Sequence, residues 1–214
     1  MPRQNRVTPF SSIVSESARG TLSGNRGCLH DERQNIRRPF QGTRWIICLL
    51  EFKGRQRNVM TPGHYRELFF LDEVTALAAG HRPCAECQRG RFTQFRDLWA
   101  TANPEMAGMP NPTATVLDLA LHEERTATND NGIRSCMSIE NLPDGVFVTD
   151  DEHDAYLVLS EQLLRWSPAG YERAIAALEY PVRILTPASV VRTLAAGYPA
   201  GIHDSAFETL DRYA

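Results

Sequence analysis

The alternation of apolar and polar positions becomes regular only after residue 43. An apolar and β-branched run at 45–52 stops at Lys53-Gly54, which predicts a strand followed by a turn. Residues 55–60 can return beside it as the second strand of a hairpin, and 67–71 predicts another short strand. We therefore expect a small β-structure in this part of the chain.

Helical signals follow directly after these strands. Asp72 and Gly80 have the residue types that occur at the N-cap and just past the end of a helix, so we expect a short helix between them. Apolar residues recur at helical spacing through 88–102, which makes this the best predicted helix. Beyond residue 112 we expect helices at 113–125 and 171–178, a helix that opens at Thr186-Pro187 with the threonine as N-cap and ends at Gly197, and strands at 146–148, 155–159, 163–166 and 182–185.

The predicted elements divide the chain into three regions. Residues 1–40 are polar and basic without apolar periodicity, and are expected to form a loosely structured arm. A hairpin and helix module is expected at 41–103, and three prolines and a glycine at 103–112 indicate a boundary before a mixed region at 113–214. Because strands and helices do not alternate regularly, the predicted fold class is α+β.

The net charge of -3 conceals a gradient along the chain. Residues 1–96 carry 16 basic and 8 acidic side chains, whereas 97–214 carry 7 and 18. Lys53 is the only lysine, so the basic half is rich in arginine, the better bidentate ligand for phosphate. No apolar run is long enough to span a bilayer and no export signal is evident, so we expect a cytoplasmic protein.

The spacing of Cys84 and Cys87 is the strongest chemical signal in the sequence. Two cysteines separated by two residues can direct both sulfurs at one ion from a tight turn, and a helix that starts just after them favours thiolates. A redox pair and two buried cysteines without a metal are the alternatives, but a redox pair usually lies between a strand and a helix of a β-α-β unit. We therefore predict a structural zinc site that stabilises the 41–103 module.

A tetrahedral zinc site needs two further ligands. Cys48 is the first choice because it lies centrally in a predicted strand of the same module, and His64 is the second because it lies in the turn before the next strand. A buried cysteine without a metal is the alternative for Cys48. The remaining candidates are Cys28, His30, His81, His122 and Cys136.

The segment 69–87, FFLDEVTALAAGHRPCAEC, resembles the second half of the Ada-type metal-binding domain. That family binds zinc through four cysteines and is associated with DNA repair, so the resemblance implies zinc at Cys84 and Cys87 and an association with DNA. His81 stands where the family has an aromatic residue, and no cysteine pair lies shortly before residue 69. The whole chain also resembles a group of bacterial proteins, a resemblance that implies no activity.

Histidine next to a carboxylate occurs in two similar segments, His30-Asp31 and His122-Glu123. Such pairs can serve a metal-dependent hydrolase or nuclease as ligands and general base. On a helix, however, adjacent side chains point about 100° apart, so His122 and Glu123 cannot both face one ion. A solvated helix surface is the alternative for this second pair.

Three functions are compatible with these patterns. The first is zinc-stabilised binding of nucleic acid, preferably DNA, and the second is a metal-dependent hydrolase that uses the two histidine-acid pairs. The third is an interaction module in which zinc is only structural. Oligomeric state is left open, and the arginines expected to meet phosphates in the first case are Arg44, Arg55, Arg57, Arg82, Arg89 and Arg91.

Overall fold

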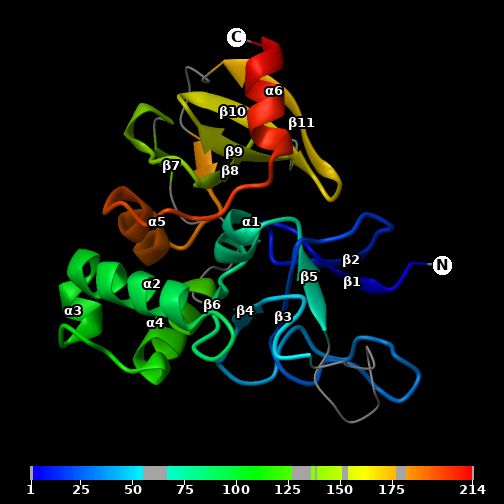
Figure 1. Cartoon of the computed structure of the whole chain (residues 1–214), viewed down its shortest axis with the longest axis vertical. Coiled ribbons are helices and arrows are strands. Elements are labelled where there is room, and N and C mark those ends of the chain that lie inside the picture. The colour runs from blue at the N-terminus through cyan, green and yellow to red at the C-terminus, as the bar shows by residue number, and fades with distance from the viewer. Residues whose placement is uncertain are drawn as a thin grey trace.

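The computed structural model describes residues 2–54, 67–126, 136, 137, 139–150, 154–176 and 182–213. Within these residues the chain forms two six-stranded sheets and six α-helices, which confirms the α+β class predicted from the sequence. Figure 1 shows the second sheet with α6 at one end of the molecule, the first sheet at the other, and α1 between them. No helix in the described ranges is long and apolar enough to cross a bilayer.

The first sheet combines strands from the N-terminal region with strands of the expected module, in the order β2-β1-β5-β3-β4-β6. The β1–β5 and β4–β6 pairs are parallel, and the other neighbours are antiparallel. The predicted strands at 45–52 and 67–71 are present in shorter form, whereas the return strand at 55–60 lies outside the described residues. The strands are β1 (Gln4–Val7), β2 (Ile13–Ser15), β3 (Leu22–Asn25), β4 (Ile46–Cys48), β5 (Leu68–Phe70) and β6 (Arg82–Pro83).

The N-terminal region is not the loose arm that its composition predicted, because β1, β2 and β3 belong to this sheet. Its strands are only three or four residues long, and β1 and β3 also pair with strands far away in the sequence, so local periodicity did not predict them. Position 24 in β3 requires glycine, because a Cβ there would lie 2.1 Å from the carbonyl oxygen of Ile46 in β4. Arg26 is 1% exposed and stacks on Trp45, which fixes the region to the module.

Three predicted helices of the central region are confirmed. Asp72 caps α1, its side chain accepting a hydrogen bond from the Thr75 amide, and Gly80 follows the helix with a positive φ of 82°. Helix α2 buries Phe92, Phe95 and Trp99, the positions that predicted it. A short helix, α3, lies within the proline-rich stretch. The bounds are α1 (Glu73–Ala78), α2 (Arg89–Ala102), α3 (Pro104–Ala107) and α4 (Ala114–Thr126).

The second sheet has the order β11-β10-β9-β8-β12-β7 and is antiparallel throughout. The helix predicted at 171–178 is wrong, because these residues begin with β11, which pairs with β10 as a hairpin through the turn at 167–170. Pairing with a neighbouring strand overrides the weak helical pattern. The strands are β7 (Cys136–Met137), β8 (Phe147–Thr149), β9 (Ala155–Leu159), β10 (Gln162–Ser167), β11 (Gly170–Ala176) and β12 (Val182–Ile184).

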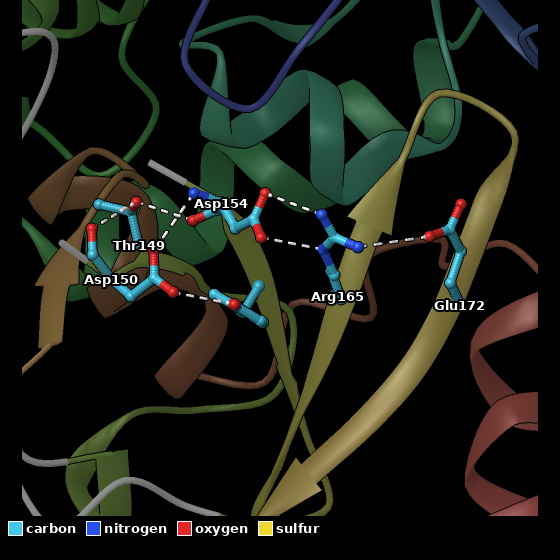
Figure 2. A network of polar contacts seen from close by, with 6 residues as sticks. Thr149, Asp150, Asp154, Arg165 and Glu172 are labelled. Atoms are coloured by element: carbon cyan, nitrogen blue, oxygen red, sulfur yellow. Dashed lines mark hydrogen bonds and ion pairs between the residues drawn. The ribbon is translucent and has the colours of Figure 1, made fainter. Parts of the chain in front are cut away.

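A polar network crosses the surface of this sheet (Figure 2). Arg165 on β10 forms an ion pair with Asp154 and lies 3.9 Å from a carboxylate oxygen of Glu172 on β11. Asp150 accepts hydrogen bonds from the Asp154 amide and the Tyr156 hydroxyl. Burial and the Asp150 carboxylate raise the pKa of Tyr156 to about 12. These contacts connect Asp150, just after β8, with Asp154 and Tyr156 at the start of β9.

The C-terminal part ends in two helices that pack on different parts of the molecule. Thr186 is not the N-cap expected for the first of them: the cap is Pro187, and the Thr186 hydroxyl accepts a hydrogen bond from the Phe147 amide instead. The Thr186 side chain therefore bonds to strand β8 and does not cap α5. The elements are the short 3-10 helix Ile139–Asn141, α5 (Ala188–Ala195) and α6 (Ser205–Tyr213).

Two buried carboxylates at the start of α1 join the two halves of the fold. The Asp72 carboxylate accepts hydrogen bonds from the Tyr171 hydroxyl at 2.8 Å and the His203 amide at 3.0 Å, and burial raises its pKa. The Glu73 carboxylate accepts from the Tyr198 hydroxyl at 2.6 Å and the Gly201 amide at 2.8 Å. These hydrogen bonds connect α1, which precedes the cysteine pair in the chain, to the C-terminal segment.

Replacing Glu73 with alanine should lower the free energy of unfolding by about 3 kcal/mol, because it leaves the buried Tyr198 hydroxyl and the part-buried Gly201 amide without an acceptor. Urea unfolding followed by circular dichroism measures the change. Glu172 is the matched control, since its ion pair is exposed and its removal should cost about 0.5 kcal/mol or less. Equal losses for the two variants would contradict a bridging role for Glu73.

Candidate metal centre

Three cysteine sulfurs meet at the edge of the first sheet. The Sγ atoms of Cys48, Cys84 and Cys87 all lie within 4.8 Å of one another. Within the described part of the chain, this is the only group of at least three His, Cys, Asp or Glu side chains close enough to hold an ion. Cys48 thus lies beside the cysteine pair, as its predicted role as a ligand requires, and the three side chains could hold a metal ion.

Strand register determines how these sulfurs meet. The parallel pairing of β4 with β6 aligns Ile46 with Arg82 and Ile47 with Pro83, so Cys48 and Cys84 occupy the next positions of the two strands. The Cys84 amide donates to the Ile47 carbonyl at 2.9 Å and extends this alignment. A turn at 85–88 then brings Cys87 back toward both residues before α2 begins.

The surroundings of the three sulfurs make their acidities unequal. The neighbouring Cys48 side chain and the Glu86 amide, which donates a hydrogen bond to Cys84 Sγ at 3.4 Å, lower the pKa of Cys84 to about 5. The neighbouring Cys84 sulfur and burial both disfavour ionisation of Cys48 and raise its pKa. Burial also raises the pKa of Cys87. The cluster therefore carries one thiolate at neutral pH, ready to start metal binding.

The donor set suits a thiophilic ion. Zinc–sulfur bonds of about 2.3 Å place sulfurs about 3.8 Å apart in a tetrahedron, so binding requires only a modest contraction of the cluster. His64, the second predicted ligand, lies outside the described residues, and its role stays a prediction. Cys28 takes no part, because its sulfur lies 3.9 Å from the His30 carbonyl oxygen in a separate loop. The side chain of Cys136 also lies outside the described residues.

All three cysteines line a cleft of about 620 Å³. Its apolar wall includes Phe69 and Leu50, and Leu50 is 52% exposed. Arg44 and the carboxylates Glu67 and Glu86 supply charge at the same cleft. A metal bound to the three sulfurs is therefore close to a space that can admit a small molecule.

A buried ion pair forms another wall of the cleft. Arg82 of β6 forms two hydrogen bonds with Asp118 of α4, at 3.0 and 2.9 Å, and its guanidinium lies 5.1 Å from the Phe92 ring centroid. Both partners are almost fully buried. Burial raises the pKa of Asp118 despite the arginine beside it. Asp118 could not be predicted as part of this site from the sequence, because the partners are 36 residues apart and no local pattern connects them.

His81, which stands where the Ada-type domain has an aromatic residue, performs the packing role of one. Its ring centroid lies 4.7 Å from that of Phe70 and 5.2 Å from that of Trp45. It is fully buried, and neither ring nitrogen has a hydrogen-bond partner within the described residues. Burial and nearby arginines lower its pKa well below the usual value, so the ring is neutral and its place is in the core.

The histidine-acid pairs do not converge on a metal site in the described part of the chain. His30 is buried, and Asp31 instead accepts hydrogen bonds from two amides and the Arg37 side chain of its own loop. His122 packs edge-on against Phe40, while Glu123 is exposed. This arrangement does not support the hydrolase hypothesis. The Asp31 carboxylate instead stabilises its own loop through these hydrogen bonds.

The predicted phosphate-binding arginines fall into different environments. Arg82 is occupied by Asp118, and Arg91 by Glu73 and the Pro199 carbonyl, so neither is offered to an external phosphate. Arg44 and Arg89 are exposed. Arg55 and Arg57 lie outside the described residues.

Replacing Cys48 with alanine should abolish stoichiometric metal binding, because the remaining pair leaves two of four positions unfilled. Metal content is measured on protein purified without chelators. Cys28→Ala is the matched control and should bind as much metal as the wild type. Retention of a full equivalent by Cys48→Ala would contradict the three-cysteine centre.

Metal affinity should rise steeply with pH. Cys84 is already a thiolate above its pKa of about 5, whereas raised pKa values keep Cys48 and Cys87 protonated at neutral pH. Binding then displaces about two protons, so the apparent association constant should increase about 100-fold per pH unit between about pH 6 and 8. Competition with a chelating dye at several pH values measures the slope. A tenfold change per unit would show that only one proton leaves.

No family model, curated protein or solved structure matches the chain. The Ada-type resemblance at 69–87 therefore stays a prediction, and the case for the centre depends on the geometry of these residues.

Proposed function

We propose that this chain is a zinc protein that binds nucleic acid through the surface around its metal centre. The observation that carries the proposal is the convergence of Cys48, Cys84 and Cys87 within 4.8 Å. Nucleic-acid binding depends on a second observation, the excess of exposed arginines in the same half of the chain.

Zinc is the ion that this donor set favours in a cell. Thiolates select soft or borderline ions, and zinc accepts a tetrahedron of sulfur and nitrogen ligands without redox chemistry. The cysteines whose side chains the structure describes, Cys28, Cys48, Cys84 and Cys87, are all free, which favours a reducing compartment such as the cytoplasm, where thiols persist. The ion would link β4 to the turn before α2, and so hold together segments more than thirty residues apart.

Exposed arginines in the basic half of the chain support an anionic partner. Arg33 and Arg38 are exposed in the loop after β3, Arg44 lies at the cleft, and Arg89 starts the helix that follows the cysteines. Guanidinium groups in such positions bind phosphates bidentately and draw nucleic acid by counterion release. Because residues beyond 96 carry an excess of acidic side chains, the net charge of the whole protein would not attract nucleic acid, and binding would depend on the local arginines.

Zinc is tested by elemental analysis of the protein prepared without chelators. We expect one zinc per chain, and its removal should lower the thermal unfolding midpoint, because binding free energy adds to the stability of the folded state. Restoring zinc should restore the midpoint. A metal-free protein with unchanged stability would end the proposal.

Nucleic-acid binding is tested by titrating labelled DNA and RNA duplexes and single strands at several salt concentrations. Replacing both Arg44 and Arg89 with alanine should weaken binding and reduce the slope of log affinity against log salt by about two. Arg173→Ala is the matched control, since this arginine is exposed on β11 of the acidic half. If the zinc-loaded wild type binds no nucleic acid at low salt, a structural zinc module that contacts another protein is the better hypothesis.

A further inference from the structure

We propose that the fourth coordination position of the metal faces the cleft and accepts a neutral heteroaromatic nitrogen donor, of the imidazole or purine class, from a separate molecule. This inference rests on the zinc site of the proposed function and adds a ligand-binding role to it. It would make the centre a place where a small molecule is recognised as well as a structural clamp.

The first step is the geometry of three ligands around a tetrahedral ion. The fourth vertex of a tetrahedron points away from the face formed by the other three. Cys48, Cys84 and Cys87 all line the cleft, so an ion seated on the cleft side of their sulfurs directs its remaining vertex into that space. Zinc sites with three protein ligands and one exchangeable position are those that bind external molecules.

The second step is the size and lining of the cleft. A volume of about 620 Å³ lies within the range of about 300–1,000 Å³ that small-molecule sites occupy. Ile46, Leu50, Phe52 and Phe69 provide apolar and aromatic surface close to the cysteines. A flat ring that ligates the ion can lie against this wall, and stacking on aromatic side chains favours ring systems over aliphatic donors.

The third step is charge. Zinc with three thiolates has a net charge of -1, and the cleft lining adds Glu67 and Glu86 against Arg44, beside the paired Arg82 and Asp118, so the space as a whole stays negative. An anionic fourth ligand such as a thiolate would raise the negative charge in a partly desolvated space, which is costly. A neutral nitrogen donor leaves the charge unchanged, and zinc accepts nitrogen readily. Heteroaromatic nitrogen is therefore the donor that best matches both the ion and the wall.

The test uses the full-length protein loaded with cobalt(II), whose visible absorption bands report the ligands of the ion. Imidazole and, separately, 2-mercaptoethanol are titrated into the loaded protein. We expect imidazole to change the bands saturably and at lower concentration than the thiol. Unchanged bands in a protein that has taken up one cobalt per chain would overturn this inference alone, whereas failure to take up cobalt would overturn both it and the proposed zinc site.

Variants separate an external ligand from one supplied by the chain. His64→Ala should bind imidazole as the wild type does; a response that appears only in this variant would assign the position to His64 and overturn the inference. Leu50→Ala, which shortens the cleft wall, should weaken imidazole binding about threefold to tenfold. Leu119→Ala is the matched control, because Leu119 is 48% exposed and does not line the cleft. Equal affinities for the two leucine variants would overturn placement in the cleft.

Discussion

The parallel pairing of β4 with β6 is the constraint on which the metal centre depends. Its register sets Cys48 beside Cys84, and the turn that follows returns Cys87 to the same point. If β4 shifted by one residue relative to β6, the Cys48 side chain would point to the opposite face of the sheet and its sulfur would move away from those of Cys84 and Cys87. The same pairing positions Arg82 for its buried ion pair with Asp118, so one register sets both the ligands and a wall of the cleft.

The metal-binding half is held in place by the C-terminal half. Residues on both sides of 103–112 belong to one hydrophobic cluster, which includes Leu77, Trp99 and Val158. The buried carboxylates of Asp72 and Glu73 add directed bonds across the same contact. Because α1 is followed closely by β6, these hydrogen bonds also limit the movement of β6 and of the cysteine pair that follows it. The acidic half therefore helps to hold the metal-binding residues in position.

Elements with strong local signals could be predicted from the sequence. The Asp72 cap and the Gly80 stop marked α1, and helical spacing of aromatic residues marked α2. The N-terminal strands escaped prediction because they are short and pair with distant partners, as β1 does with β5. The segment at 171–178 was assigned the wrong structure because its hairpin partner, and not its own residues, decides its conformation.

The candidate site divides along the same line. The sequence by itself determined that Cys84 and Cys87 can share an ion, since two residues of separation within one turn suffice, and it ranked Cys48 first among possible partners. Only the tertiary structure decided that Cys48 lies beside them and that His81 packs against the ring of Phe70. It also decided that Arg82 forms a buried ion pair with Asp118. Those outcomes depend on strand register and burial, which arise from contacts between residues distant in the chain, and no local spacing encodes them.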